Sequence, residues 1–373
     1  MTALPPAAHL AALMSLDGMW PRRARLVLAR RSPEAAWEAL LDGALARSVP
    51  LLRALRGRGP ELVQGWAEQA RALDVPRLWQ RHLQLGIGVT EPRAHPAALR
   101  EDPAPPTVLF HRGGFDHLDG ARVAIVGTRK CTRYGRDVAF DLGAQLAEAG
   151  VGVVSGLALG IDAEAHRGAL AGTPTAPPIA VVGSGLDVVY PRANDVLWQQ
   201  VAERGLLLSE APLGAAPEGW RFPARNRLIA ALADVVVVVE SHVRGGSMST
   251  VDEALRRDRP VLAVPGSVRS DASAGTNALL AQGAGPVTGV DDVLAVLGCT
   301  PGPRRPVADD RLAPDEMGAT VLDAVGWQPS TLDQVVLRTA FDVGAVALAV
   351  ERLIEAGWLV RTGGWLERVP AHR

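Results

Sequence analysis

Two apolar segments in the middle of the chain each end in small residues that suit phosphate binding. The first begins at Val123 and ends at Gly127, and the second ends at Ser155 and Gly156. Each continues into a helical pattern, which predicts a βαβ unit whose strand ends and helix N-termini can approach a phosphate closely. The cations beside these ends are Arg129, Lys130, Arg133 and Arg167. Glycine turns edged with cations predict a site for one anion or for a series of anions.

The common catalytic motifs do not fit these strand ends. The lysine of a P-loop precedes serine or threonine, whereas Lys130, the only lysine in the chain, precedes Cys131. The first turn lacks the G-x-G-x-x-G pattern of dinucleotide sites, and the serines at the strand ends lack the G-x-S-x-G pattern of a nucleophile elbow. Asp162 and His166 could share a metal, but no third ligand lies nearby, so capping and packing are the favoured interpretation. We therefore expect no catalytic residue, no cofactor and no metal.

Length and composition narrow the class of protein. The 373 residues suffice for two or three domains, and a formal net charge of −1 excludes a globally basic nucleic-acid binder but allows a locally basic groove. No apolar run is long enough to cross a bilayer, and the N-terminus lacks the features of a secretory signal. Cys131 and Cys299 have no partner motif. These features predict a cytoplasmic protein without a membrane contact.

Residues 1–105 are predicted to form a small helical domain. Six helical patterns occupy this region. The connection Leu16–Trp20 is like that of a helix-hairpin-helix or SAM-like unit, and Arg22, Arg23 and Arg25 follow it. Such a unit can hold a nucleic-acid backbone at the N-terminus of its second helix, but a helical bundle with a basic surface explains the pattern at least as well.

Residues 106–299 are predicted to form a doubly wound α/β domain, which the proline-rich segment Pro92–Pro106 separates from the first. Continuous apolar strands are typical of a parallel sheet buried on both faces, and here they alternate with helical patterns over short connections. Ligands of such sheets bind at the carboxyl ends of the strands. The predicted strands are Arg122–Val126, Gly152–Ser155, Ile179–Val182, Leu206–Ser209, Val235–Glu240 and Val261–Val264.

The last part of the chain is predicted to be a winged-helix domain. Residues 300–315 have the composition of a linker, and residues 316–373 show three helical patterns followed by two short strands. Ser330 is the predicted N-cap of the second helix. Because residues 316–373 hold five arginines and seven acidic residues, they attract phosphates weakly. A protein-contact or packing role is therefore favoured over DNA binding.

Short motifs run through nearly all of the central domain. They are GTRKCTRYG (127–135), SGLALGIDAEAHRGAL (155–170), GSGLDVVYPRAN (183–194), SEAP (209–212), FPARNRLIAALADVVVVVE (222–240), GGSMSTVDEAL (245–255), RPVLAVPG (259–266) and GTNALLAQGA (275–284). In sequence and in order these motifs resemble the DNA-processing protein A family, also called Smf. The N-terminal and C-terminal regions resemble attachments of that family more loosely.

The resemblance implies both a fold and a function. The fold is an extended Rossmann-like doubly wound parallel sheet that dimerises, flanked by the helical domain and the winged helix. The function is non-enzymatic binding and protection of single-stranded DNA in natural transformation and recombination. The implied partners are single-stranded DNA, a second copy of the chain, the RecA recombinase that the protein loads onto the strand, and single-strand-binding protein, which it displaces or works beside.

The resemblance also assigns a DNA-binding pocket. Arg129 matches the arginine of the family's first glycine turn, and Arg167 matches a basic position at which many members have lysine. Thr132 stands where a serine is usual and keeps the hydroxyl. The predicted DNA-binding residues are Gly127, Arg129, Lys130, Thr132, Ser155, Gly156, Arg167, Asn226, Gly245, Gly246 and Ser247.

Stacking candidates and an alternative function complete the predictions. Tyr134, Tyr190 and Phe222 lie inside the edge motifs and could stack on bases, although aromatic residues are more often packed in a core. The alternative is a nucleotide phosphoribohydrolase acting on nucleoside monophosphates, because Arg244–Thr250 followed by Glu253 partly matches P-G-G-x-G-T with a following glutamate. The proline and the third glycine of that motif are missing.

Overall fold

Two compact units make up the chain, one over residues 1–302 and the other over residues 303–373. The structure, a computed structural model, describes residues 4–171, 175–299 and 311–369. Each unit has its own hydrophobic core. Among the described residues, no helix combines the length and the apolar character that crossing a bilayer requires.

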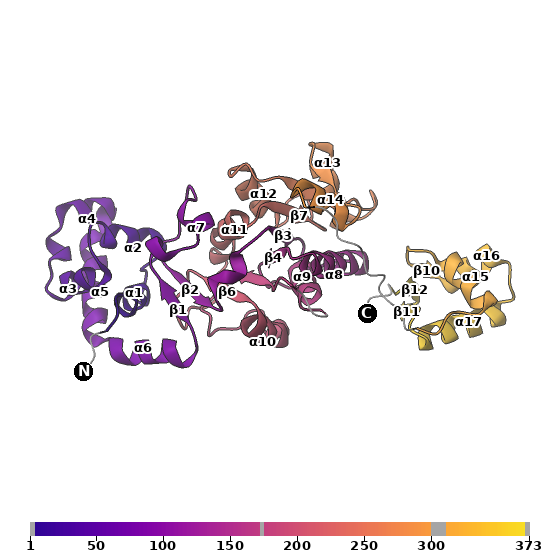
Figure 1. Ribbon diagram of the computed structural model, residues 1–373, viewed down its shortest axis with the longest axis horizontal. Coiled ribbons are helices and arrows are strands. Elements are labelled where there is room, and N and C mark those ends of the chain that lie inside the picture. Colours follow the sequence, from indigo (N-terminus) through magenta and orange to yellow (C-terminus); the bar gives the residue numbers. More distant parts are fainter. Residues whose placement is uncertain (1–3, 172–174, 300–310, 370–373) are drawn as a thin grey trace. The chain divides into compact units, whose positions relative to one another are not determined.

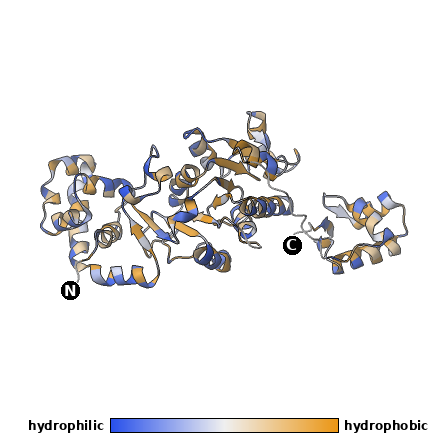
Figure 2. Cartoon of the chain, in the orientation of Figure 1, coloured by the Kyte–Doolittle hydropathy of each residue, from blue (hydrophilic) through white to orange (hydrophobic). Residues whose placement is uncertain are grey.

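A nine-stranded sheet forms the centre of the first unit (Figure 1). Its order is β1-β2-β6-β5-β4-β3-β7-β8-β9, and neighbouring strands are parallel except for β1–β2 and β2–β6. The central strands are hydrophobic along their length (Figure 2), as a sheet covered on both faces requires. The strands are β1 (Gly88–Thr90), β2 (Leu109–Arg112), β3 (Arg122–Val126), β4 (Gly152–Ser155), β5 (Ile179–Val181), β6 (Leu206–Ser209), β7 (Val235–Val238), β8 (Val261–Ala263) and β9 (Gly285–Pro286).

The predicted parallel α/β fold is confirmed, and all six predicted strands are present. Strands β3, β4 and β6 have the predicted bounds, whereas β5, β7 and β8 end one or two residues early. At the end of β7 the reason is local, because Glu240 already belongs to a loop and its carbonyl accepts the N–H of Thr128 at 2.7 Å. Strands β1, β2 and β9 were not predicted, since runs of two to four residues give no recognisable periodicity.

Helices cover both faces of the sheet, and the alternation of side chains along each strand decides which helix they meet. On β3, Val123 and Ile125 pack with α8, α9 and α14, whereas Ala124 and Val126 pack with α7, α11, α12 and α13. The helices of this part are α7 (Ala97–Arg100), α8 (Arg133–Glu148), α9 (Ile161–Leu170), α10 (Asp195–Arg204), α11 (Arg221–Leu232), α12 (Met248–Leu255), α13 (Ala274–Ala281) and α14 (Val290–Val296).

The chain order of the strands creates a switch point at the carboxyl end of β3. From β3 the chain adds β4, β5 and β6 on one side, and it then returns to add β7, β8 and β9 on the other side. Helices α8 and α12, which follow β3 and β7, therefore lie on opposite faces of the sheet. Ligands of open α/β sheets bind at such a point.

The N-terminal helices belong to the same compact unit as the sheet. They share one hydrophobic core with α10 and with residues of β5 and β6, among them Ala180 and Leu207. The sheet also begins earlier than predicted, because β1 pairs with β2. These helices are α1 (Pro6–Met14), α2 (Pro21–Leu28), α3 (Pro33–Leu41), α4 (Val49–Ala54), α5 (Gly59–Ala72) and α6 (Val75–Gln84).

The proline-rich segment Pro92–Pro106 packs against helices that cover one face of the sheet. Leu99 is fully buried in the core that contains α11 and α12. Asp102 forms an ion pair with Arg257 at 2.6 Å, and both side chains are less than a tenth exposed. The segment therefore contributes to the packing of the first unit. The domain boundary at residues 105 and 106 stays a prediction.

Within residues 311–369 the second unit has three helices and a small antiparallel sheet of order β10-β12-β11. The three helices and the two strands after them have the order predicted for residues 316–373, whereas β10 was not predicted, and the winged-helix assignment stays a prediction. Part of the predicted linker, residues 300–310, lies outside the described residues, whereas Arg311 donates to the carbonyls of Gly357 and Val369. The elements are α15 (Glu316–Val325), β10 (Ser330–Thr331), α16 (Leu332–Thr339), α17 (Val343–Glu355), β11 (Leu359–Thr362) and β12 (Trp365–Arg368).

The predicted N-cap of α16 is wrong by one residue. Thr331 is the cap, because its Oγ1 accepts the N–H of Gln334 at 3.3 Å while its own N–H donates to the Gln334 side chain at 3.0 Å. This reciprocal pair is a capping box. Ser330 instead lies in β10, and its hydroxyl donates to the carbonyl of Val325 at 3.1 Å. Either hydroxyl suits a cap, and only the backbone register selects between them.

We predict that the two units unfold separately. Leu353→Ala empties a buried position in the core of the second unit and should cost about 2–5 kcal/mol there. Leu348→Ala, on the same helix but 56% exposed, is the matched control and should change stability by less than about 0.5 kcal/mol. Calorimetry should show only one of two transitions lowered by the first change. A single transition that moves as a whole would contradict this.

Candidate nucleic-acid interface

The first glycine turn is fixed to the end of β7 by one carboxylate. Glu240 is 1% exposed, and its side chain accepts the N–H of Thr132 at 2.8 Å and the Thr132 hydroxyl at 2.6 Å. The Thr132 hydroxyl oxygen also accepts the N–H of Gly135 and so caps α8. A Cβ at Gly127 would lie 2.7 Å from the Glu240 carbonyl oxygen, so this position requires glycine.

A cleft opens beside this turn, over the carboxyl ends of β4 and β5. Arg129 reaches into it with its guanidinium carbon 5.2 Å from the centre of the Phe222 ring. The Phe222 and Tyr190 rings lie 5.5 Å apart at an angle of 31°. Two of the three predicted stacking residues are thus brought beside the predicted arginine. The residues that line the cleft are Arg129, Gly156, Ala158, Leu159, Val182, Gly183, Ser184, Tyr190, Pro191, Phe222 and Arg225.

Arg225 forms the buried wall of this cleft and was missing from the predicted site. Its guanidinium donates to the carbonyl of Val181 and occupies the space beside Gly156, where a Cβ would lie 2.0 Å from it. Burial lowers the pKa of Arg225 to about 10, while the carboxylate of Asp162 opposes this shift, so the side chain is charged at neutral pH. The RNR motif that contains it was the available signal.

The predicted site residues separate into those that line the cleft and those that build its frame. Arg129 and Gly156 line it. Ser155 is fully buried and donates to the carbonyl of Ile125 at 2.6 Å, so it supports the end of β4. Lys130 is exposed in the turn, and its N–H donates to the Thr128 hydroxyl at 3.2 Å.

A second group of predicted residues is joined at the end of β7. The Asn226 side chain donates to the hydroxyl of Ser249 at 2.6 Å, and that hydroxyl donates to the carbonyl of Gly246 at 2.8 Å. Ser247 donates to the hydroxyl of Ser241 at 2.8 Å and is 8% exposed. This loop is not among the residues that line the Arg129 cleft. The polar groups of this loop form hydrogen bonds with one another, as a folded loop requires.

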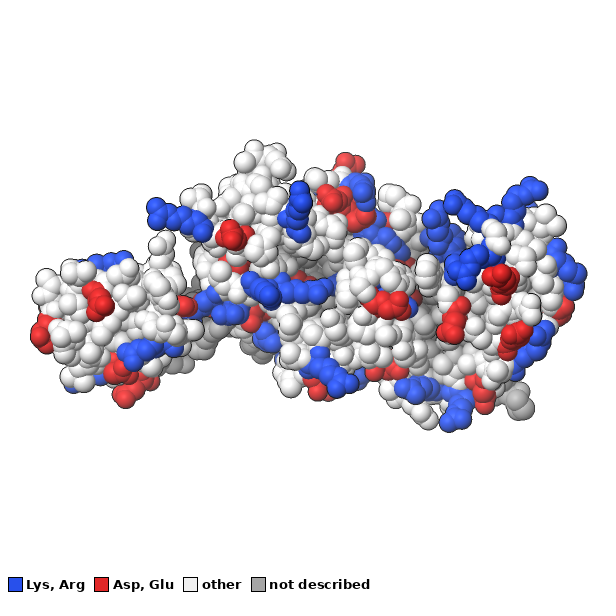
Figure 3. Space-filling view, turned by 180° about the vertical axis from the view of Figure 1, so that it is seen from behind, with Lys and Arg blue, Asp and Glu red and all other residues white. Residues whose placement is uncertain are grey.

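Arg167 and Tyr134 lie outside the lining of the cleft. Arg167 is on the last turn of α9 and forms an ion pair with Glu164 at 2.9 Å. The Tyr134 hydroxyl donates to the carbonyl of Pro265 at 2.8 Å, and the side chain is 47% exposed. Arg192, which was not predicted, is exposed directly after the lining residue Pro191. Figure 3 shows cationic side chains in separate groups with carboxylates between them, so that face of the molecule is not uniformly basic.

The residues of the metal hypothesis and of the alternative hydrolase make contacts within the fold. Asp162 accepts the N–H of Gly156 at 3.2 Å, and His166 faces the carbonyl of Ile179, so the pair does not converge on a metal. Across residues 4–171, 175–299 and 311–369, no cluster of three or more metal-ligating side chains is present. Glu253, the acid of the hydrolase hypothesis, forms ion pairs with Arg256 and Arg257.

The fold and the site define an α/β protein with a Rossmann-like sheet and a cationic, aromatic cleft at its carboxyl edge. The profile of the DNA recombination-mediator protein A family matches residues 87–298. The putative DNA processing protein DprA of Mycobacterium tuberculosis is 35% identical over 373 residues, which cover 97% of this chain and 91% of that protein. Protein Smf of Synechocystis is 32% identical over 352 residues, with coverages of 84% and 88%.

Solved structures agree with these relatives. DNA processing protein A of Streptococcus pneumoniae superposes with a TM-score of 0.63 at 31% identity, covering 79% of this chain and 98% of that one. The protein of the same name from Helicobacter pylori, described for its unique single-stranded DNA binding mode, gives a TM-score of 0.52 at 33% identity, with coverages of 57% and 95%. The chain belongs to the DNA recombination-mediator protein A family.

We predict that Glu240→Ala destabilises the first unit. The change leaves the Thr132 N–H and hydroxyl without their buried acceptor and should cost about 3 kcal/mol, since hydrogen bonds to charged groups are worth roughly 1.5–3 kcal/mol each. Glu148→Ala, at an exposed position, is the control and should lie within about 0.5 kcal/mol of the parent. Urea unfolding measures both. Equal midpoints for the two variants would contradict the role given to Glu240.

We predict a pH-dependent contribution from His166. Burial lowers its pKa to about 4 in the folded protein, against an ordinary value of 6.5. Between these two pH values the unfolded chain therefore binds a proton at His166 and the folded protein does not. The free energy of unfolding falls as the pH drops from about 6.5 to about 4, by about 3 kcal/mol in total. Unfolding of the parent and of His166→Gln across this range should show that the variant loses less stability. Parallel pH profiles would contradict this.

Proposed function

We propose that the chain binds single-stranded DNA in the Arg129 cleft. The observation that carries this proposal is the convergence of Arg129, Arg225, Tyr190 and Phe222 at the carboxyl edge of the sheet. Non-specific binding of single strands combines cations for the phosphates with aromatic faces for the bases, and the cleft offers both. Family membership and the single-stranded DNA binding described for the Helicobacter pylori relative support the same function.

Each residue of the cleft has a separate task in this proposal. Arg129 contacts a phosphate, since Phe222 supports its guanidinium and fixes the direction of the fork. Arg225 holds a buried positive charge behind the strand. Gly156 has no side chain, which leaves its place to the Arg225 guanidinium. Tyr190, which is 38% exposed, offers its ring to a base. Nothing here reads base edges, so the binding is independent of sequence.

The wider role in this proposal follows the family. The chain protects single strands in natural transformation and recombination, acts as a homodimer, and loads RecA onto the strand in competition or cooperation with single-strand-binding protein. It does so without catalysis. Family membership supports this role, as does the engagement of Asp162, His166 and Glu253 in structural contacts.

Arg129→Ala should weaken binding to single-stranded DNA on the order of thirty-fold. The change removes a charge-assisted hydrogen bond worth roughly 2 kcal/mol. Arg77→Ala, on the exposed surface of α6, is the matched control and should bind as the parent does. Arg167→Ala should also stay within about two-fold, because that side chain pairs with Glu164 outside the cleft. Fluorescence anisotropy with a labelled oligothymidylate measures all three variants.

The salt dependence and the strand preference test the same proposal independently. With three or four phosphates neutralised, log K against log salt should fall with a slope of about −2 to −3. Single strands should bind more tightly than duplexes of the same length, because a duplex hides its base faces from Tyr190. Equal affinity for both forms, or an Arg129→Ala variant that binds like the parent, would refute the proposal.

A further inference from the structure

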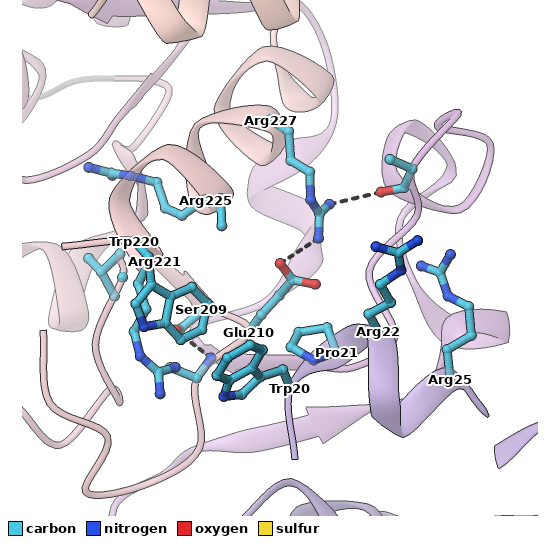
Figure 4. Close-up of a pocket in the computed structure, with 15 residues that line it drawn as sticks. Trp20, Pro21, Arg22, Arg25, Ser209, Glu210, Trp220, Arg221, Arg225 and Arg227 are labelled. Atoms are coloured by element: carbon cyan, nitrogen blue, oxygen red, sulfur yellow. Dashed lines mark hydrogen bonds and ion pairs between the residues drawn. The ribbon is translucent and has the colours of Figure 1, made fainter. Parts of the chain in front are cut away.

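A larger cavity lies next to the cleft, between the N-terminal helices and the sheet. Its volume is about 360 Å³. Helix α2 and the residue before it contribute Trp20, Arg22 and Arg25, while the loop after β6 and the start of α11 contribute Glu210 and Trp220 (Figure 4). Thr107, in the segment before β2, holds the start of α2 against the sheet by donating to the carbonyl of Pro21 at 3.0 Å. The cavity is thus built from segments that are almost two hundred residues apart.

The cavity has a strong excess of positive charge. Five arginines and one carboxylate line it, which is a formal charge of +4 in a protein whose net charge is −1. Glu210 pairs with Arg227 at 2.5 Å, and Arg221 pairs with Glu218, which is not a lining residue, at 3.5 Å. Arg22 and Arg25 belong to α2 and are exposed. The five arginines are Arg22, Arg25, Arg221, Arg225 and Arg227.

Several buried polar atoms of this lining have no hydrogen-bond partner within the described part of the chain. They are Oε1 of Glu210, Nε of Arg221 and Nε of Arg225. Buried polar atoms of native proteins are nearly always paired. Glu210 and Arg221 thus keep unused hydrogen-bonding capacity in the wall of the cavity, whereas the Arg225 guanidinium belongs to the wall of the cleft.

Two exposed tryptophans form one wall. The rings of Trp20 and Trp220 lie 5.1 Å apart at 40°, and the residues are 47% and 41% exposed. Guanidinium groups of Arg23 and Arg221 lie 4.7 Å from the centres of these two rings. A wide aromatic surface beside the exposed arginines Arg22 and Arg25 fits a flat base attached to a phosphate better than it fits a simple inorganic anion.

The cavity continues into the Arg129 cleft. Val182, Gly183 and Arg225 line both hollows. In Figure 4 the side chain of Arg225 points away from Glu210, and its guanidinium belongs to the wall of the cleft. A chain molecule lying over Gly183 can therefore occupy both hollows at once.

We propose that this cavity is a second nucleotide site, which takes a phosphorylated base stacked on Trp20 and Trp220 with its phosphate held by the arginines. The proposal rests on the proposed function, because the strand in the Arg129 cleft supplies the nucleotide that enters. A free nucleotide has the same chemistry, and the experiment separates the two sources. The N-terminal helices thereby contribute directly to strand binding through Trp20 and Arg22.

The test compares oligothymidylates of about 4 and about 16 nucleotides by fluorescence anisotropy. The short strand occupies the Arg129 cleft, whereas the long one also reaches the cavity. Trp20→Ala and Trp220→Ala should each weaken the binding of the long strand on the order of ten-fold. The affinity for the short strand should stay within about two-fold of the parent's. Trp20→Phe and Trp220→Phe keep an aromatic face and should restore most of the loss, while the unchanged affinity of the alanine variants for the short strand shows that they are folded.

Trp327→Ala is the matched control. Trp327 is also exposed, and a guanidinium lies 5.0 Å from its ring centre, but it belongs to the second unit. This variant should bind both strands as the parent does. Thymidine 5′-monophosphate provides the second arm, by competition against the labelled long strand. Competition that Trp20→Ala abolishes assigns the site to a free nucleotide, and a length effect without such competition assigns it to the strand.

The two proposals fail in different ways. In one outcome, Arg129→Ala weakens the binding of both strands, while the tryptophan variants bind both strands and the mononucleotide as the parent does. The second site is then refuted and the proposed function stands. If Arg129→Ala changes the affinity for neither strand, the proposed function fails. An affinity for the mononucleotide that depends on Trp20 would then still support the second site.

Discussion

The site depends on the carboxylate of Glu240, which joins the loop after β7 to the turn after β3. These two strands are neighbours at the switch point, where the helices that follow them leave on opposite faces and a crevice would otherwise remain open. Glu240 closes this crevice by binding Thr132, and its own carbonyl accepts the N–H of Thr128. The ligand cleft therefore moves along the sheet edge, to the ends of β4 and β5, with Arg129 at its border.

Glycine makes this arrangement possible at the points of closest contact. A Cβ on Gly135 would lie 2.3 Å from the Glu240 carboxylate, and one on Gly156 would collide with Arg225. The glycines of the edge motifs thus serve two purposes, because some admit buried charged side chains of the protein and others leave room for a ligand. Sequence reasoning treats all of them as phosphate-binding turns, since the two uses give the same pattern of residues.

The distribution of charge also depends on contacts between distant parts of the chain. The protein is nearly neutral, and most of its arginines are held by carboxylates or carbonyls, as Arg257 is by Asp102 and Glu253. At the cavity between α2 and α11, segments from different parts of the chain bring five arginines and one carboxylate together. Such a local excess directs an anionic strand to one path, which a uniformly basic surface would not do.

The sequence by itself determined the parallel sheet and the bounds of β3, β4 and β6, because buried strands leave local patterns. It also predicted a ligand site at the carboxyl ends of the strands, and the resemblance to the family singled out Arg129 there, which stays a prediction. Only the tertiary structure decided which residues share the cleft. It placed Arg225, Phe222 and Tyr190 beside Arg129 and left Arg167 paired on α9, because contacts between distant segments depend on strand order and helix packing, which no local pattern contains.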